Sequence, residues 1–150
     1  MKALRILFMA AMFSLCFPHN VGATEGAEVF DIRKGEVIAT IPNSALLQDQ
    51  ARMWLSSVNG IAGAVQIEPN DGIAIKVMLT PPQEIHNLWI TGTATEVVVF
   101  IGKEQNYKPT LLVFTKENRL IAFLMKDGML ENFLKQNNLY SPDLNVGNVH

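Results

Sequence analysis

The clearest pattern along the chain is a stripe of apolar side chains that recur every three or four residues over 47–58. Its members are Leu47, Ala51, Trp54, Leu55 and Val58. This spacing places them on one face of an α-helix, and most of the residues between them are polar. Asn43 or Ser44 precedes the stripe and can cap the helix by accepting hydrogen bonds from its first backbone N–H groups. We therefore expect an amphipathic helix that stops at Asn59-Gly60.

Residues 72–79 alternate with the period of two that is typical of a strand. Ile73, Ile75, Val77 and Leu79 share one face, and the residues between them share the other. Because Pro69-Asn70-Asp71 is a strong turn sequence, we expect residues 63–68 to form a hairpin with this strand. A strand with one solvated face belongs near the edge or on an open side of an antiparallel sheet.

Three further segments are apolar on both faces, at 95–101, 110–115 and 119–125. Strands of this kind are covered on both sides and lie in the middle of a sheet. The predicted helices can cover one face, and the first hairpin and the segment around Pro81-Pro82 can cover the other. If they do not, the surplus is an exposed apolar patch, which marks a partner surface or a dimer interface.

The remaining segments complete the predicted order of elements. Residues 28–32 and 36–41 are expected to form a hairpin, and Ile85, Leu88 and Trp89 have the spacing of one or two helical turns. A final helix after residue 127 would bury Leu130, Phe133 and Leu134. The order ββ-α-ββ-α-βββ-α indicates a single α+β domain with a largely antiparallel sheet over residues 24–139, followed by a flexible tail at 140–150.

The first 23 residues have the three-part order of a secretory signal peptide. Lys2 and Arg5 precede residues 6–17, which are apolar except for Ser14, and small residues follow up to Ala23. The apolar run is shorter than the roughly 20 residues that a membrane-spanning helix needs. We therefore predict cleavage after Ala23 and a secreted or extracytoplasmic product, in the periplasm or cell envelope, with no stable membrane anchor.

Cysteine content and charge narrow the possible classes of function. Cys16, the only cysteine, lies in the predicted signal peptide, so the mature domain has no thiol for a disulfide, redox exchange or a thiolate-bound metal. Loss of Lys2 and Arg5 takes the formal charge from −2 to −4, and no cluster of basic residues remains. This argues against a nucleic-acid partner. We expect no cofactor and no metal.

His86 is the only internal histidine of the predicted mature chain. It could act as an acid or base together with Glu68 or Glu96, as in a small hydrolase of wall or sugar substrates. It could equally be a surface or half-buried side chain, because no nucleophile motif or second histidine accompanies it. We expect no catalytic residue and keep His86 as a candidate binding residue.

Two aromatic residues lie between chain-breaking residues, where binding sites often have their anchors. Trp89 follows the Pro81-Pro82 break, and Tyr107 lies in the predicted loop 102–109. Aromatic side chains bury much area with few rotamers to order, so both are candidate binding residues. Each could instead close an edge of the core.

Residues 108–114 read Lys-Pro-Thr-Leu-Leu-Val-Phe and are followed by a turn, a second strand and the helix expected at 128–139. This segment resembles the last third of a thioredoxin domain, in which a proline precedes such a strand. The paired active-site cysteines of that family are absent. The resemblance therefore implies the fold without the redox activity.

A wider resemblance covers residues 41–135. It is carried by Ile41-Pro42-Asn43-Ser44, Leu79-Thr80-Pro81-Pro82, Asn87-Leu88-Trp89 and residues 112–119. These segments resemble small, uncharacterised secreted proteins of Bacillus-type bacteria. The resemblance implies an exported or envelope location and transfers no catalytic residue.

The sequence as a whole favours a non-enzymatic binding or assembly module that acts in the cell envelope or outside the cell. Its partner is expected to be an envelope or extracellular protein, or a second copy of the chain. A small hydrolase of wall or sugar substrates is the alternative.

Overall fold

The computed structural model describes residues 26–63 and 67–147. The predicted signal peptide, residues 1–23, and Cys16 within it lie outside the described residues. Within the described part, no helix combines the length and the apolar character that crossing a membrane requires.

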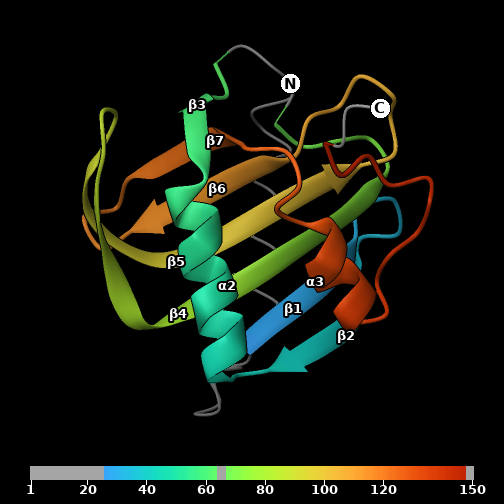
Figure 1. Cartoon of the computed structure of the whole chain (residues 1–150), viewed down its shortest axis with the longest axis horizontal. Helices are drawn as coiled ribbons and strands as arrows, with labels where there is room; N and C mark the ends of the chain where they lie inside the picture. The colour runs from blue at the N-terminus through green and yellow to red at the C-terminus, as the bar shows by residue number, and fades with distance from the viewer. Residues whose placement is uncertain (1–25, 64–66, 148–150) are drawn as a thin grey trace.

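The described residues form one seven-stranded sheet at the centre of the molecule (Figure 1). Its strands are β1 (Gly26–Asp31), β2 (Glu36–Pro42), β3 (Val58–Ile61), β4 (Gly72–His86), β5 (Thr91–Gly102), β6 (Thr110–Thr115) and β7 (Leu120–Met125). They lie in the order β2-β1-β4-β5-β6-β7-β3, and all neighbours are antiparallel. The predicted α+β class with an antiparallel sheet is confirmed, and the doubly apolar β5 and β6 lie in mid-sheet as predicted.

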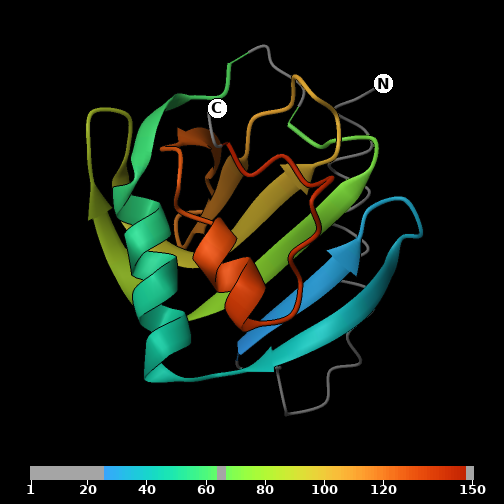
Figure 2. The same cartoon turned by 45° about the vertical axis from the view of Figure 1, so that its right-hand side comes forward.

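Two helices of the described residues, α2 (Ala45–Ser56) and α3 (Glu131–Gln136), lie on the same face of the sheet (Figure 1 and Figure 2). α2 begins where the sequence predicts, because the Ser44 hydroxyl accepts a hydrogen bond from the backbone N–H of Leu47 at 3.1 Å. α2 follows β2 at one edge of the sheet and leads into β3 at the other edge. It therefore crosses the whole sheet.

The main core fills the space between the sheet and the two helices. Trp54 of α2 is buried there and meets Phe133 of α3 edge to face, with ring centroids 4.9 Å apart. The indole N–H of Trp54 donates to the backbone carbonyl of Met129 at 3.3 Å. This aromatic pair holds the two helices together over the sheet.

The prediction of a strand at residues 63–68 is wrong. The structure has β3 directly after α2, at Val58–Ile61, while Gly63, Ile67 and Glu68 are not in a strand and residues 64–66 lie outside the described range. β3 pairs with β7, far away in the sequence, and not with β4. The strand conformation of these four residues therefore comes from a distant partner.

The short helix predicted around Ile85 is also wrong, because residues 83–86 end β4 and pair with residues 91–94 of β5. A tight turn at Asn87 joins the two strands. The side-chain Oδ1 of Asn87 accepts hydrogen bonds from the N–H groups of Trp89 and Ile90, both at 2.9 Å. An asparagine side chain that satisfies backbone groups two and three residues on favours a turn over a helix.

The tail predicted to be flexible is packed as far as Gly147. Leu144 and Val146 are buried. The backbone N–H of Asn145 donates to the Gly102 carbonyl at 2.8 Å, and its side-chain amide donates to the Gln105 carbonyl at 2.9 Å. The packed domain therefore continues past residue 139.

The two segments that the sequence suggested as a cover do not lie over the second face of the sheet, opposite the helices. The first hairpin, β1 and β2, extends the sheet at its edge instead of lying over this face. The Pro81-Pro82 segment is part of β4. The helices thus cover one face of the sheet, while the first hairpin and the Pro81-Pro82 segment are parts of the sheet itself.

Candidate binding surfaces

The hairpin of residues 83–94, which we call the arm, is the part in which β4 and β5 pair beyond the three-stranded ladder. β6 joins it only at its base, where Ala94 pairs with Thr115. It curves away from the other strands at one end of the molecule (Figure 1). At its base, β4 and β5 lose their register between Met78 and Gln83, and the Thr80–Pro81 peptide is cis. The interruption separates the arm from the regular part of the ladder.

Gln48 of α2 holds this interruption in place. Its side-chain NH2 donates to the carbonyl of Met78 at 2.9 Å, and its Oε1 accepts the N–H of Thr80 at 3.1 Å. Arg52, one turn further along α2, donates from Nε to Oε1 of Gln83 at 3.0 Å. The position of the arm is therefore set by side chains of the helix as well as by strand pairing.

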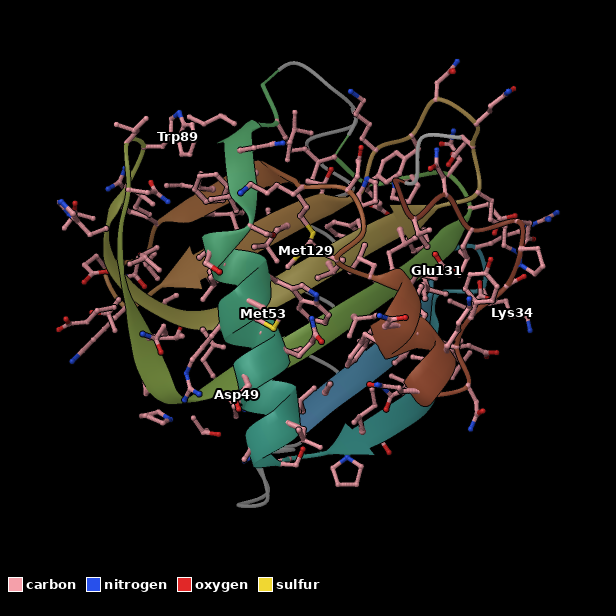
Figure 3. All side chains as sticks on the ribbon, in the orientation of Figure 1. Lys34, Asp49, Met53, Trp89, Met129 and Glu131 are labelled. Atoms are coloured by element: carbon pink, nitrogen blue, oxygen red, sulfur yellow. The ribbon has the colours of Figure 1, made fainter. Side chains whose placement is uncertain are left out.

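Trp89 lies at the tip of the arm, on the side that faces β3 (Figure 3). Its ring is half-buried and packs at a tilt against Phe123 of β7, with centroids 6.0 Å apart. Ile85 and Ile90 of the arm also pack against the main core. The arm thus closes one end of the core, and Trp89 is a core-edge residue that stays partly accessible.

An apolar surface remains exposed around this contact. We call it the arm patch and define it as Ile61, Leu88 and Trp89. Leu88 at the turn is 92% exposed. Ile61 of β3 is 50% exposed and is the register partner of Phe123, on which Trp89 packs. β3 and the arm lie side by side in both views (Figure 1 and Figure 2).

Sequence reasoning did not identify Ile61 and Leu88 as surface residues. The spacing of Leu88 assigns it to the buried face of a helix, and Ile61 falls between two predicted elements. The one local signal is Asn87, a residue that favours tight turns and would have placed Leu88 at a hairpin tip.

His86 is brought close to the arm patch, because it lies on the arm two residues before Leu88. Its side chain is exposed, and Nδ1 lies 2.8 Å from the hydroxyl oxygen of Thr91, its partner across the hairpin. The arm therefore unites two of the predicted binding residues, His86 and Trp89.

Tyr107 does not join them. It is buried in a second apolar cluster, on the sheet face opposite the helices. Its hydroxyl donates to the carbonyl of Ile67, and burial raises the pKa of this phenol above its usual range. The surroundings of Tyr107 favour the alternative stated for it, a side chain that closes an edge of the core.

Three charged side chains, Glu28, Lys76 and Glu96, lie together on the same face as Tyr107; we call them the charged trio. Glu28 on β1 is the register partner of Lys76 on β4, and Lys76 Nζ lies 3.9 Å from Glu96 Oε2. The exposed fractions of the Lys76 and Glu96 side chains are 12% and 20%, and that of Glu28 is 7%. Burial raises the pKa of Glu96, an effect that Lys76 opposes and Glu28 reinforces.

The residues named for a hydrolase do not share one site. Glu68 lies before the first residue of β4 and His86 is its last residue, so the two are at opposite ends of a strand of 15 residues. Glu96 lies five positions along β5 from Thr91, the partner of His86, which is roughly 16 Å. Acid–base catalysis needs its groups within hydrogen-bond reach of one substrate.

A group of ion pairs at the Gly72 end of β4 fastens the C-terminal tail. Lys103 Nζ lies 3.7 Å from Asp71 and 3.3 Å from Asp143. The hydroxyl of Ser141 donates to Asp143, and this bond and Lys103 hold the pKa of the Asp143 carboxyl below its usual range. These contacts join loops to the tail, so we assign them a structural role.

Within residues 26–63 and 67–147, no group of three or more histidine, cysteine, aspartate or glutamate side chains is placed to hold a metal ion. Comparison with protein-family models, with curated proteins and with solved structures found no match for this chain. The resemblances to thioredoxin and to secreted proteins of Bacillus-type bacteria therefore stay expectations.

Proposed function

We propose that this protein is an extracytoplasmic, non-enzymatic binding module and that the arm patch is its contact surface. The observation that supports this most is the 92% exposure of Leu88 next to the half-buried Trp89, whose ring packs on Phe123, the register partner of the half-exposed Ile61. An apolar surface built from two segments far apart in the sequence differs from the single scattered apolar residues that are common on protein surfaces.

The arm patch has the properties of a preformed contact site. Trp89 is held against Phe123, and the base of the arm is tied to α2 through Gln48, so little freedom is left to lose on binding. Half-buried aromatic residues with aliphatic neighbours are typical anchors for protein partners. The predicted signal peptide adds the location, so the proposed partner is an envelope or extracellular protein.

Leu88 and Leu46 provide a matched pair for testing this proposal. Leu46 is 83% exposed in the first turn of α2, at the end of the helix away from β3. The protein, Leu88→Ser and Leu46→Ser are each used as crosslinking bait in envelope extract. We expect a stoichiometric partner whose recovery falls at least about tenfold with Leu88→Ser, as for an interface anchor worth more than about 1.4 kcal/mol, and is unchanged with Leu46→Ser.

Equal recovery with both variants would reject the arm patch as the contact surface. If the recovered partner is the protein itself, sedimentation of the same variants should show a dimer that Leu88→Ser dissociates. The hydrolase alternative has no comparable support, because Glu68, Glu96 and His86 lie apart.

A further inference from the structure

Asn59 and Gly60 form the one Asn-Gly pair of the sequence. An asparagine can react with its own backbone, because attack by the next residue's nitrogen on the side-chain carbonyl carbon closes a succinimide ring. Glycine as the next residue favours this reaction, since it has no side chain to block the approach and leaves the backbone free to turn. Whether the reaction occurs in a folded protein depends on how the fold holds these two residues.

β3 gives Asn59 a place outside the regular ladder. The register of β3 against β7 shifts between Val58 and Gly60, so Asn59 is a bulge residue without a register partner. A bulged residue is left out of the ladder of backbone hydrogen bonds. β3 is also an edge strand of four residues, and short edge strands open more easily than strands inside a sheet. The backbone at Asn59 therefore has more freedom than that of a residue in a regular ladder.

The surroundings of the two residues are also open. Asn59 is exposed, and its side chain makes no hydrogen bond to another residue of the ranges 26–63 and 67–147. At Gly60, no atom of a described residue other than its chain neighbours lies within 4 Å of the position that a Cβ would take. The Asn59 amide is thus free to change its rotamer, and nothing crowds the glycine beside it.

Asn118 offers a comparison within the same chain. It is also exposed, in the turn between β6 and β7. The next residue is Arg119, whose backbone N–H donates to the hydroxyl oxygen of Thr115 at 3.1 Å. The nitrogen that would attack Asn118 is therefore held in a hydrogen bond, and it belongs to a residue with a large side chain. Exposure alone does not make Asn118 equivalent to Asn59.

We propose that Asn59 is a site of spontaneous deamidation in the folded protein. The backbone nitrogen of Gly60 loses its proton to water and attacks Cγ of Asn59. The C–N bond of the side-chain amide breaks, and the amide nitrogen takes up a proton from water and leaves as ammonia. A water molecule then opens the succinimide at either of its carbonyls, which gives aspartate or isoaspartate. The net reaction consumes water and releases ammonia, so water is the co-reactant.

Isoaspartate would change the edge of the sheet as well as its charge. It brings Cβ of residue 59 into the main chain, so the backbone before Gly60 becomes longer by one bond. Ile61 follows directly, as the register partner of Phe123 and a member of the arm patch. We expect isoaspartate to weaken the pairing of β3 with β7, whereas aspartate only adds a charge. The proposal concerns the reaction of Asn59 and does not depend on a partner of the arm patch.

Ageing of the folded protein at neutral pH, followed by site-resolved peptide mass spectrometry, tests the reaction. We expect conversion at Asn59 to exceed that at Asn118 at least about tenfold, because the nitrogen next to Asn118 is held away from the geometry of attack. Gly60→Ala is the matched variant, since Gly60 has no positive φ and the structure has room for a methyl group there. It should slow conversion of Asn59 at least about fivefold at an unchanged circular dichroism spectrum.

Three results would each overturn the proposal. They are equal conversion at Asn59 and Asn118, an undiminished rate in Gly60→Ala, and conversion at Asn59 that appears only when the protein is unfolded in urea.

Hydrogen exchange measures the consequence for the sheet. The N–H of Ala62 donates to the Ala122 carbonyl at 2.9 Å, and that of Lys126 donates to the Ser57 carbonyl at 3.0 Å. These two amides report on the two ends of the β3–β7 pair, and we expect both to exchange several-fold faster in the isoaspartate form. Asn59→Asp is the control, because it adds the charge without the longer backbone and should exchange like the unaged protein. Equal exchange in all three forms would overturn the expected loss of pairing.

Discussion

Gln48 on α2 and Thr80 on β4 are joined by a hydrogen bond of 3.1 Å, in which the buried side-chain oxygen of Gln48 accepts the backbone N–H of Thr80. The same side chain donates to the carbonyl of Met78, on the other side of the break in the ladder. A glutamine thus supplies the donor and the acceptor that the neighbouring strand does not offer here.

Replacement of Gln48 by alanine should therefore destabilise the protein. Two backbone groups of β4 would lose their partners, and an unsatisfied buried polar group costs about 1–3 kcal/mol. We expect Gln48→Ala to lower the free energy of unfolding in urea by that amount. Gln50→Ala, a substitution on the same helix, should change it by less than about 0.5 kcal/mol. Equal effects of the two variants would contradict the bridging role.

The two neighbours at the tip of the arm should differ sharply in their contribution to stability. Leu88 is almost fully exposed, so Leu88→Ser should change the free energy of unfolding by less than about 0.5 kcal/mol. Trp89 packs on Phe123 at the edge of the core, and Trp89→Ala should cost about 2 kcal/mol. Chemical denaturation of both variants checks this, and a neutral Trp89→Ala would place the indole outside the core.

Tyr107 should act as a core residue. Tyr107→Phe removes the hydroxyl that donates to the Ile67 carbonyl and should cost about 1 kcal/mol. Tyr107→Ala also removes the buried ring and should cost about 3–5 kcal/mol. Urea denaturation measures both values. A stable Tyr107→Ala variant with weakened partner binding would instead support the role expected from the sequence.

Glu96 should make stability depend on pH. Burial raises its pKa in the folded protein above the value of 4.5. At a pH between 4.5, the ordinary pKa of the carboxyl, and its raised pKa in the folded protein, the folded protein holds a proton that the unfolded chain has released. The free energy of unfolding therefore falls as the pH rises through this window. Glu96→Gln should flatten that fall, while Glu36→Gln at the exposed start of β2 should not. Urea denaturation from about pH 4.5 to about pH 7.5 tests this, and parallel curves for wild type and Glu96→Gln would contradict it.

The C-terminal tail should be needed for stability. A chain that stops after Leu139 loses the buried Leu144 and Val146 and the hydrogen bonds of Asn145. Burial of each apolar side chain is worth about 1.5–3 kcal/mol, so the truncation should cost about 3 kcal/mol or more. A chain that stops after Gly147 is the control and should melt like the full chain. Equal melting temperatures for both truncations would show that the tail only lies on the surface.

Much of the sheet and the long helix could be predicted from local periodicity. The stripe that contains Leu47 and Trp54 has helical spacing, and β4 alternates with a period of two. Each pattern therefore indicates its type of secondary structure without any knowledge of distant contacts. A different local signal, apolar residues on both faces, predicts the mid-sheet position of β5 and β6. In each of these elements the apolar residues themselves indicate whether one face or both faces are buried.

The elements that could not be predicted depend on distant contacts or on single side chains. β3 has four residues, including Asn59 and Gly60, and becomes a strand through β7. The helical spacing of Ile85, Leu88 and Trp89 is a coincidence within a hairpin whose turn is closed by Asn87. Burial of Tyr107 likewise follows from the course of a loop, which a single sequence does not reveal.

The path of α2 from one edge of the sheet to the other has a consequence for the order of folding. β3 pairs with β7, whose residues leave the ribosome about 60 positions later. Until then, the part of the sheet that lies under the β3 end of α2 is incomplete. A growing chain of this protein therefore cannot complete its sheet until its C-terminal third is made. The same delay leaves any chain that stops before β7 exposed to proteases.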